Sequence, residues 1–407
     1  MINRIFEKIG IICINAYSLL AGMIYNRSAK TVLIGAWMGE KFADNSRYLF
    51  QYLSANKNKY DLKNVVWVTR NEDVRDTLDS LGYQVCLIGT KESKIWHLKA
   101  GIHILCNTAF PLKSYDTDID TRYSFGAKKI QLWHGVGFKA VGMSSNEAEG
   151  NRIHGVMRRI LDSRICSIMQ SHGGWTEAKV VATSLKNGDA LQKVTGCRKD
   201  RILLTGYPRH CECPRLLPRE LKVISYVKSF ESSILYLPTF RSDVSHYTNP
   251  LENREFVNYL NSHNILWIEK PHSADKYYNK KDYGINNVLA LESDFDINVL
   301  YIYLSAVMSD YSSAVFDAIR LNIPVIMYTP DLDIFKNGDV GFLFDIEQYC
   351  AGLLAYTPEQ CKNMTVDIIE GRYYNIQRKD VYRSVREDFF GSSTDSLDEI
   401  WNKIDEC

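Results

Sequence analysis

From Thr31 onward, short runs of apolar and β-branched residues alternate with longer stretches whose apolar positions recur at helical spacing. The runs TVLIGA, NVVWVT, YQVCLIG and IHILCNT have the length and composition of buried strands. Between them, SRYLFQYLS and residues 72–81 carry helical periodicity. Strands that are separated by helical segments in this way predict a parallel sheet with helices on both faces.

The same alternation returns in the second half of the chain. Residues 304–328, LSAVMSDYSSAVFDAIRLNIPVIMY, predict a strand at 306–308, a turn, a helix that begins at Ser312 and Ser313, and a second strand at 323–327. Such a βαβ unit turns the amide groups at the helix start toward the carboxyl edge of the sheet, where a phosphate can bind. Capping of the helix by these polar residues is the alternative interpretation.

At 407 residues the chain exceeds one ordinary core, and we expect an α/β protein with two Rossmann-like domains. The proline-containing stretch GYPRHCECPRLLPREL separates them. The expected parts are an N-terminal segment (1–30), a first domain (31–206), a linker (207–220), a second domain (221–390) and a C-terminal helix (391–407).

Composition narrows the possible functions. Apolar content of 45% and charged content of 24% are typical of a folded globular protein. A formal net charge of +1 argues against a general nucleic-acid binder. The ten cysteines lack paired metal-ligand spacing, and no secretory cleavage pattern precedes them, so we expect reduced cytosolic thiols.

The first 30 residues predict a helix with a strong apolar side. Apolar residues keep helical spacing from Ile2 to Met23, with polar and basic residues between them. The part from Gly10 to Tyr25 would be about 24 Å long, short of a hydrocarbon core of about 30 Å. Two interpretations stay open: a helix in the membrane interface, with Arg4 and Lys8 near the headgroups, or a helix packed on its own protein.

Two loops that follow strands of the first domain carry candidate chemistry. In KKIQLWHGVGFKAVGM, a strand at 130–133 ends at His134, and Gly135, Gly137 and Lys139 follow. An imidazole can accept a proton near neutral pH, glycines let a substrate approach closely, and Lys139 would attract a phosphate. A hydrogen-bonded structural histidine is the alternative.

The loop after the first strand, GAWMGEKFADNSRYLF, also lies where ligands of such sheets bind. Its polar residues are Lys41, Asp44, Asn45, Ser46 and Arg47. Both ligand binding and a capped helix start explain them.

Three strand ends of the second domain converge on one edge of its predicted sheet. SILYLPTFRSD ends with Arg241 in a loop, ILWIEKPHS ends with Lys270 and His272, and the third ends at Ser312 and Ser313. A guanidinium, an ammonium, an imidazole and a helix start together provide what a pyrophosphate needs.

In their order along the chain, six motifs resemble those of the CDP-glycerol glycerophosphotransferases of bacterial teichoic acid and capsule synthesis. The motifs are QLWHGVGFKAVG, GYPR, YLPTFR, KPHS, SDYSSAVFDAI and PVIMYTPDLD. The resemblance covers about Val32 to Thr357. Family members commonly have PTWR and KPHP, so Phe240 and Ser273 are departures that bear on fine positioning.

The resemblance implies a GT-B fold with an interdomain active-site cleft, and transfer of glycerol phosphate from CDP-glycerol with release of CMP. It implies no metal and no cofactor, a lipid-linked saccharide or growing polymer as acceptor, and peripheral attachment to the cytoplasmic face of the bacterial cell membrane. By position, His134 corresponds to the catalytic base. The residues assigned to substrate binding are Gly135, Lys139, Arg241, Lys270, His272, Asp310, Ser312, Ser313 and Asp317.

Three alternatives remain. A relative that uses CDP-ribitol, or a nucleotide-sugar glycosyltransferase, would share the architecture. A non-catalytic membrane scaffold is disfavoured, because folding does not require His134 and the cationic set together. The sequence leaves open the polyol, the acceptor, the choice between priming and polymerising, and the oligomeric state.

Overall fold

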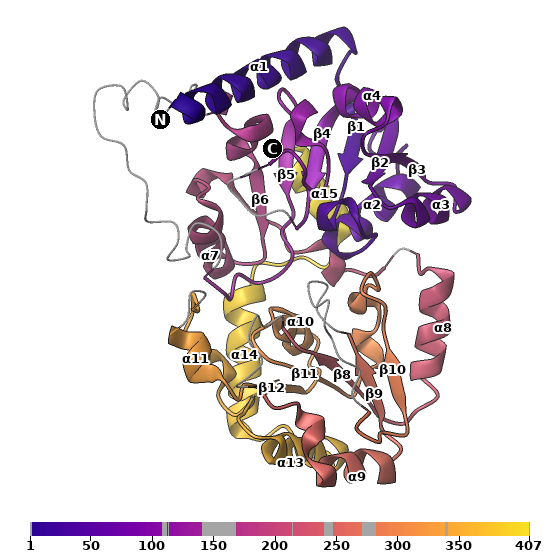
Figure 1. The fold of residues 1–407 in the computed structure, drawn as a ribbon, viewed down its shortest axis with the longest axis vertical. Coiled ribbons are helices and arrows are strands. Elements are labelled where there is room, and N and C mark those ends of the chain that lie inside the picture. Colours follow the sequence, from indigo (N-terminus) through magenta and orange to yellow (C-terminus); the bar gives the residue numbers. More distant parts are fainter. Residues whose placement is uncertain are drawn as a thin grey trace. The chain divides into compact units, whose positions relative to one another are not determined.

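A computed structural model of the chain describes residues 2–107, 112, 114–140, 168–213, 215–239, 247–270, 282–337 and 341–406 (Figure 1). The chain forms two compact units, each with its own parallel sheet. Unit 1 contains Met1–His134, Val141–Pro214 and Ser392–Cys407, and unit 2 contains Gly135–Ala140 and Arg215–Gly391. The predicted α/β class with two parallel sheets is confirmed.

Within the described residues, unit 1 has a seven-stranded sheet in the order β3-β2-β1-β4-β5-β6-β7. The strands are β1 (Ser28–Ile34), β2 (Asn64–Thr69), β3 (Gln84–Leu87), β4 (Ala100–Leu105), β5 (Lys128–Gln131), β6 (Lys179–Ala182) and β7 (Ile202–Leu204). At the centre, Val32 pairs with Val65 on one side and Ile102 on the other. All three side chains are buried, as expected for a parallel sheet covered on both faces.

The α-helices described in unit 1 are α1 (Ile2–Ile24), α2 (Asp44–Ala55), α3 (Glu72–Ser80), α4 (Lys91–Lys99), α7 (Leu185–Thr195) and α15 (Leu397–Asp405). Helix α15 comes from the far end of the chain and lies beside α2 (Figure 1). There Lys59 and Tyr60 donate hydrogen bonds to the Asp398 carboxylate. The last residues of the chain are therefore part of unit 1.

The described part of unit 2 has a six-stranded sheet in the order β10-β9-β8-β11-β12-β13. The strands are β8 (Ser233–Leu237), β9 (Leu266–Glu269), β10 (Val288–Ala290), β11 (Ala306–Ser309), β12 (Val325–Tyr328) and β13 (Leu354–Ala355). The α-helices described are α8 (Pro218–Val227), α9 (Arg254–Ser262), α10 (Ala314–Arg320), α11 (Leu332–Asn337), α12 (Ile346–Cys350), α13 (Pro358–Ile369) and α14 (Ile376–Phe390). Met308 pairs with Tyr236 and Ile326, which places β11 at the centre.

Two elements differ from the sequence prediction. Strand β5 ends at Gln131 and not at Trp133, because Trp133 has a left-handed backbone with φ of +60°, which cannot continue a strand. Helix α14 was not predicted, because charged residues dominate its sequence. Its buried Val381, Val385 and Phe389 nevertheless recur every fourth residue and pack it on unit 2.

Candidate active site

The candidate base, His134, lies at the carboxyl edge of the unit 1 sheet. It follows β5, and its imidazole stacks on the Trp133 ring with the ring centres 4.7 Å apart. The Trp37 ring of the 3-10 helix η1 (Trp37–Gly39), which follows β1, has its centre 6.4 Å from the imidazole. Loops from two different strands thus meet at one imidazole, as is typical of ligand sites in parallel sheets.

Burial favours the neutral form of the His134 imidazole. Burial lowers its pKa below the ordinary value of 6.5, and the negative charge of Asp44 opposes this shift without reversing it. His134 Nδ1 is buried and has no hydrogen-bond partner among the described residues, so a substrate would meet the other ring nitrogen, Nε2. A neutral imidazole has a nitrogen lone pair, so this side chain can accept a proton from a substrate hydroxyl.

The backbone around His134 is strained. Trp37, Met38, Asp44 and Trp133 have φ of +50°, +56°, +64° and +60°, respectively. A left-handed conformation costs about 1–2 kcal/mol for a residue with a β-carbon. Such strain persists only where surrounding contacts enforce it, and it is typical of active sites.

The Asp118 carboxylate supplies part of this support. Its Oδ1 accepts a hydrogen bond from Met38 N at 2.9 Å, and its Oδ2 accepts from Cys106 N and Asn107 N, each at 2.7 Å. Gly35 lets the Asp118 backbone come close, since a β-carbon at Gly35 would lie 2.1 Å from the Asp118 carbonyl oxygen. No sequence motif indicates this role, because the partners are backbone amides of separate segments.

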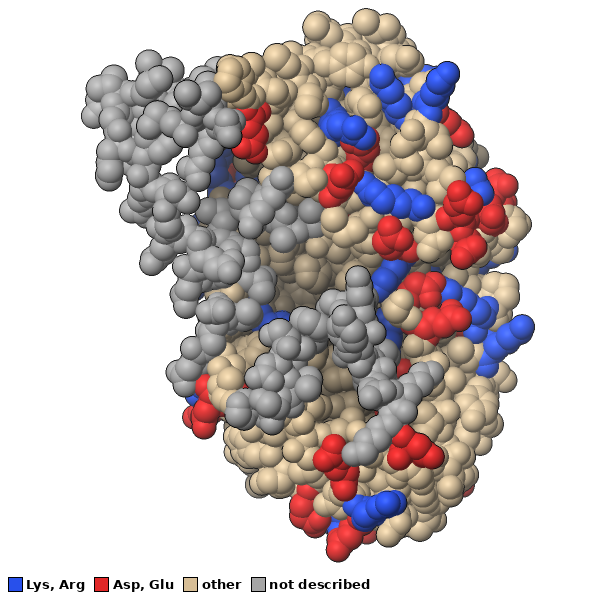
Figure 2. Space-filling view, viewed as in Figure 1, with Lys and Arg blue, Asp and Glu red and all other residues tan. Residues whose placement is uncertain are grey.

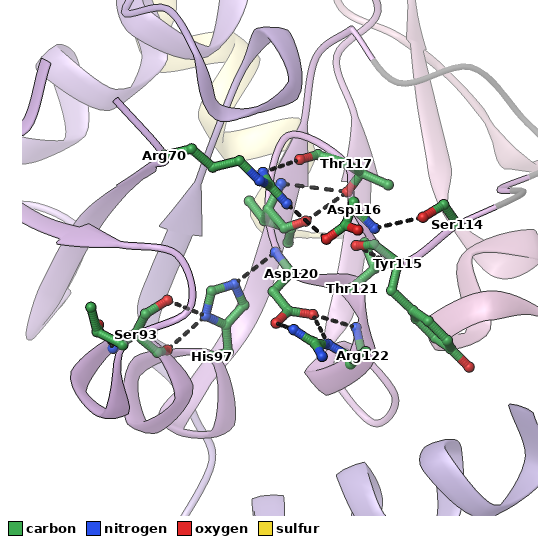
Figure 3. Close-up of polar contacts among 12 residues, drawn as sticks. Arg70, Ser93, His97, Ser114, Tyr115, Asp116, Thr117, Asp120, Thr121 and Arg122 are labelled. Carbon is green, nitrogen blue, oxygen red and sulfur yellow. Dashed lines mark hydrogen bonds and ion pairs between the residues drawn. The ribbon is translucent and has the colours of Figure 1, made fainter. Parts of the chain in front are cut away.

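Side chains of two other segments bind the loop that carries Asp118, at Thr117 and at Asp120 (Figure 3). The buried ring of His97, from α4, accepts a hydrogen bond through Nε2 from Asp120 N at 3.0 Å. Arg70, which follows β2, donates to the Thr117 carbonyl oxygen at 2.9 Å. The position of Asp118 therefore depends on hydrogen bonds from segments outside the candidate site, at His97 and Arg70.

Most polar residues of the loop after β1 are buried and contact other residues of the protein. The buried ones are Asp44, Asn45, Ser46 and Arg47. The Asp44 carboxylate forms an ion pair with Arg209 at 2.5 Å. Helix α2 begins at Asp44, although no side chain caps it. The half-buried Lys41 differs, because its ammonium lies 4.8 Å from the centre of the Trp37 ring, next to His134.

At the carboxyl edge of the unit 2 sheet, Asp310 joins two loops. Its carboxylate accepts hydrogen bonds from Tyr311 N at 2.7 Å and from Thr239 N, which follows β8, at 3.1 Å. In addition, Ser309 Oγ donates to Leu237 O at 2.6 Å. The buried Asp310 thus braces the loop after β11 against the loop after β8.

Ser312 and Ser313, which follow Tyr311, are half-buried. Ser312 Oγ accepts a hydrogen bond from Ala314 N at 3.3 Å, so it also caps the first turn of α10. Ser313 is the N-cap residue and makes no side-chain cap bond. Lys270, half-buried, follows β9, and Asp317 is buried in α10.

The segment that follows His134, Gly135–Ala140, is part of unit 2. Phe138 packs on Phe316 of α10 and on Phe342, with ring centres 5.1 and 4.9 Å apart, respectively. Lys139 pairs with Phe342 in an antiparallel bridge, and Ala140 N donates to Gly341 O at 3.0 Å. This places Gly135 and Lys139 in the same unit as Ser312 and Ser313.

The structure therefore places the predicted residues in two groups. His134 belongs to unit 1, and the described substrate-binding candidates belong to unit 2. Arg241 and His272 lie outside the described residues, as do the departures Phe240 and Ser273. In the described part of the chain, no group of three His, Cys, Asp or Glu side chains is arranged to hold a metal ion.

The chain is similar to known proteins over most of its length. A family model described as CDP-Glycerol:Poly(glycerophosphate) glycerophosphotransferase matches residues 20–396. A teichoic acid poly(glycerol phosphate) polymerase of Bacillus spizizenii strain W23 is 24% identical over 377 residues, which cover 88% of this chain and 89% of that protein.

A second relative has a different polyol in its name. A teichoic acid poly(ribitol-phosphate) polymerase of the same strain is 25% identical over 269 residues, or 63% of this chain, and the match spans only 40% of that protein. Among solved structures, the wall teichoic acid polymerase TagF has a TM-score of 0.69 at 16% identity and covers 100% of this chain and 99% of its own. This last similarity concerns the fold.

Proposed function

This chain belongs to the CDP-glycerol:poly(glycerophosphate) glycerophosphotransferase family, and on that premise we propose that it transfers glycerol phosphate from CDP-glycerol to an acceptor hydroxyl and releases CMP. The acceptor is a lipid-linked saccharide or a growing polymer of glycerol phosphate. The observation that carries this proposal is the position of His134 at a strained sheet edge, where burial favours its neutral form.

In the proposed reaction, His134 accepts the proton of the acceptor hydroxyl. The hydroxyl oxygen forms a bond to the β-phosphorus of CDP-glycerol, and the bond between that phosphorus and the bridging oxygen breaks. CMP leaves with the electron pair of the broken bond. Cations and amide groups near the phosphates stabilise the charge that develops on the leaving group.

We assign the donor phosphates to unit 2. Lys139, Lys270, Ser312 and Ser313, together with Arg241 and His272, supply the positive charge and hydroxyl groups for a pyrophosphate. Gly135 allows close approach of the substrate. The buried contacts of Asp310 and the buried position of Asp317 favour supporting roles for these two carboxylates behind the binding residues.

The proposed location is the cytoplasmic face of the cell membrane, with helix α1 as the contact. By length and composition, Phe6–Ile24 of this helix could cross a membrane. Asn15, however, donates to Ser171 O at 2.8 Å and Ser18 donates to Phe125 O at 3.2 Å, so the polar side of the helix rests on unit 1. These contacts favour a helix that lies on the membrane surface.

The test is CMP release from CDP-glycerol, with CDP-ribitol and UDP-sugars in parallel and a lipid-linked saccharide as acceptor. Acceptor-dependent CMP release should occur with CDP-glycerol. His134→Gln should lower the rate about 10²- to 10⁴-fold, the usual range for loss of a general base, while CDP-glycerol binding stays within about twofold.

Calorimetry of CDP-glycerol binding distinguishes a role of His134 as base from a role in binding the donor. Lost donor binding in His134→Gln would assign His134 to the donor and contradict its role as base. Faster CMP release from CDP-ribitol would keep the mechanism and change the product. That alternative stays open because a poly(ribitol-phosphate) polymerase is among the relatives. If the folded protein released no CMP with any donor, the non-catalytic scaffold would be favoured.

A further inference from the structure

The residue before His134 is held in its strained conformation by specific hydrogen bonds. Trp133 has φ of +60°, a conformation that a tryptophan does not adopt without support. Its carbonyl oxygen accepts a hydrogen bond from Asn45 Nδ2 at 2.8 Å and a weaker one from Cys106 Sγ at 3.1 Å. The conformation of Trp133 decides in which direction the next side chain, His134, leaves the backbone.

The Asn45 side chain is fixed at both ends. Its Oδ1 accepts a hydrogen bond from Arg209 N at 3.1 Å, so its Nδ2 must face the Trp133 carbonyl oxygen. The side chain is fully buried at the start of α2. One amide thus joins three segments that are far apart in the sequence: the start of α2, the turn after β5, and the stretch around Arg209.

We infer that Asn45 is a positioning residue for the transfer reaction: its amide holds Trp133 in the left-handed conformation that aims the His134 imidazole. The inference rests on the proposed role of His134 as base. It also gives Asn45 a role different from ligand binding, which its place in the loop after β1 suggested. Asn45 acts on the reaction through His134 and does not contact the substrate.

The diagnostic variant is Asn45→Asp. Aspartate keeps the shape and the oxygen that accepts from Arg209 N, but it loses the donor to Trp133 O. When ionised, its second oxygen repels that carbonyl, and when protonated it can donate a hydrogen bond. We expect kcat for CMP release to fall at least 10-fold at pH 8, with KM for CDP-glycerol within about twofold. The ratio of variant to wild-type kcat should rise as the pH is lowered to 6.

Asn187→Asp is the matched control. Asn187 is also buried in unit 1, and its Nδ2 donates to Thr183 Oγ1 at 3.0 Å and to the Tyr207 hydroxyl at 2.9 Å, away from Trp133. This variant should lose stability but show a kcat ratio that does not depend on pH. The inference would be overturned if kcat fell to a similar extent in both variants with no dependence on pH. It would also be overturned if Asn45→Asp raised KM and left kcat unchanged.

A second readout does not require turnover. The imidazole resonances of His134, identified by their absence in His134→Gln, should shift in Asn45→Asp and stay in place in Asn187→Asp. Identical His134 resonances in the wild-type protein, in Asn45→Asp and in Asn187→Asp would overturn the inference. If the wild-type protein released no CMP, the proposed function would be contradicted instead. The failure of the inference and the failure of the proposed function are therefore distinguishable.

Discussion

The charge state of a single side chain, His134, should set the pH dependence of the proposed reaction. Burial lowers its pKa below 6.5, and only the neutral imidazole can accept a proton. We expect kcat/KM for CDP-glycerol to reach a plateau towards pH 8 and to fall at acid pH with a midpoint below pH 6.5, as protonation removes the base. CMP release across this range measures it. An acid limb centred above pH 6.5 would contradict the assignment.

At the same residue scale, the sequence indicates His134 but not the residues that hold it. A histidine between an apolar strand and glycines is a local signal, and so are the serines before α10. Asp118 has no such signal, and Asn45 is indicated only as a polar residue of the loop after the first strand, because the partners of both residues are backbone groups far along the chain. Met38 and Asp118, for example, are 80 residues apart. Only the folded sheet brings these segments together.

Among the elements, helix α1 has an unusual orientation. Its buried positions include Asn15 and Ser18, whereas Leu20, Met23 and Ile24 are 61%, 67% and 82% exposed, respectively. Few charged side chains appear along this helix in Figure 2. Exposure of large apolar side chains beside buried polar ones reverses the usual pattern of a surface helix. The contacts of Asn15 and Ser18 bear out a helix packed on its own protein, and a helix in the membrane interface stays a prediction.

If that face binds lipid, replacing two of its side chains should release the protein from membranes. Burial of a leucine or methionine side chain is worth about 1.5–3 kcal/mol, so Leu20→Glu combined with Met23→Glu should weaken binding to phosphatidylglycerol-containing vesicles at least 10-fold. Vesicle co-sedimentation measures this. Ile376→Glu is the control, because Ile376 is 83% exposed but lies in unit 2. Equal vesicle binding by wild type and the double variant would exclude α1 as the contact.

For the whole molecule, the alternation of apolar runs and helical segments is sufficient to predict two parallel sheets. It does not show which unit each segment joins, since that depends on distant contacts. Gly135–Ala140 joins unit 2 because Phe138 packs on Phe316 and Phe342. The C-terminal residues join unit 1, where Thr394 N donates to Thr205 O at 2.9 Å. Neither pairing has a local signature.

Buried histidines should make the whole fold sensitive to acid. Burial lowers the pKa of His97 to about 4, and burial together with the positive charge of Arg27 lowers that of His103 well below 6.5. As the pH falls below 6.5, the unfolded chain therefore binds more protons than the folded chain does. The free energy of unfolding should decrease by up to about 1.4 kcal/mol per pH unit for each such histidine between pH 6.5 and about 4.

His97→Gln isolates one of these contributions, because glutamine can accept a hydrogen bond from Asp120 N but does not titrate. The variant should be less stable than wild type at pH 7.5, since it loses a well-packed ring, yet its unfolding free energy should fall less steeply between pH 6 and 5. Urea denaturation at each pH gives both slopes. His263→Gln changes an exposed histidine and should keep the wild-type slope. Parallel slopes for His97→Gln and wild type would place the acid sensitivity elsewhere. A reduced slope would instead show that the neutral form of His97, which accepts the hydrogen bond from Asp120 N, contributes to the acid sensitivity of the fold.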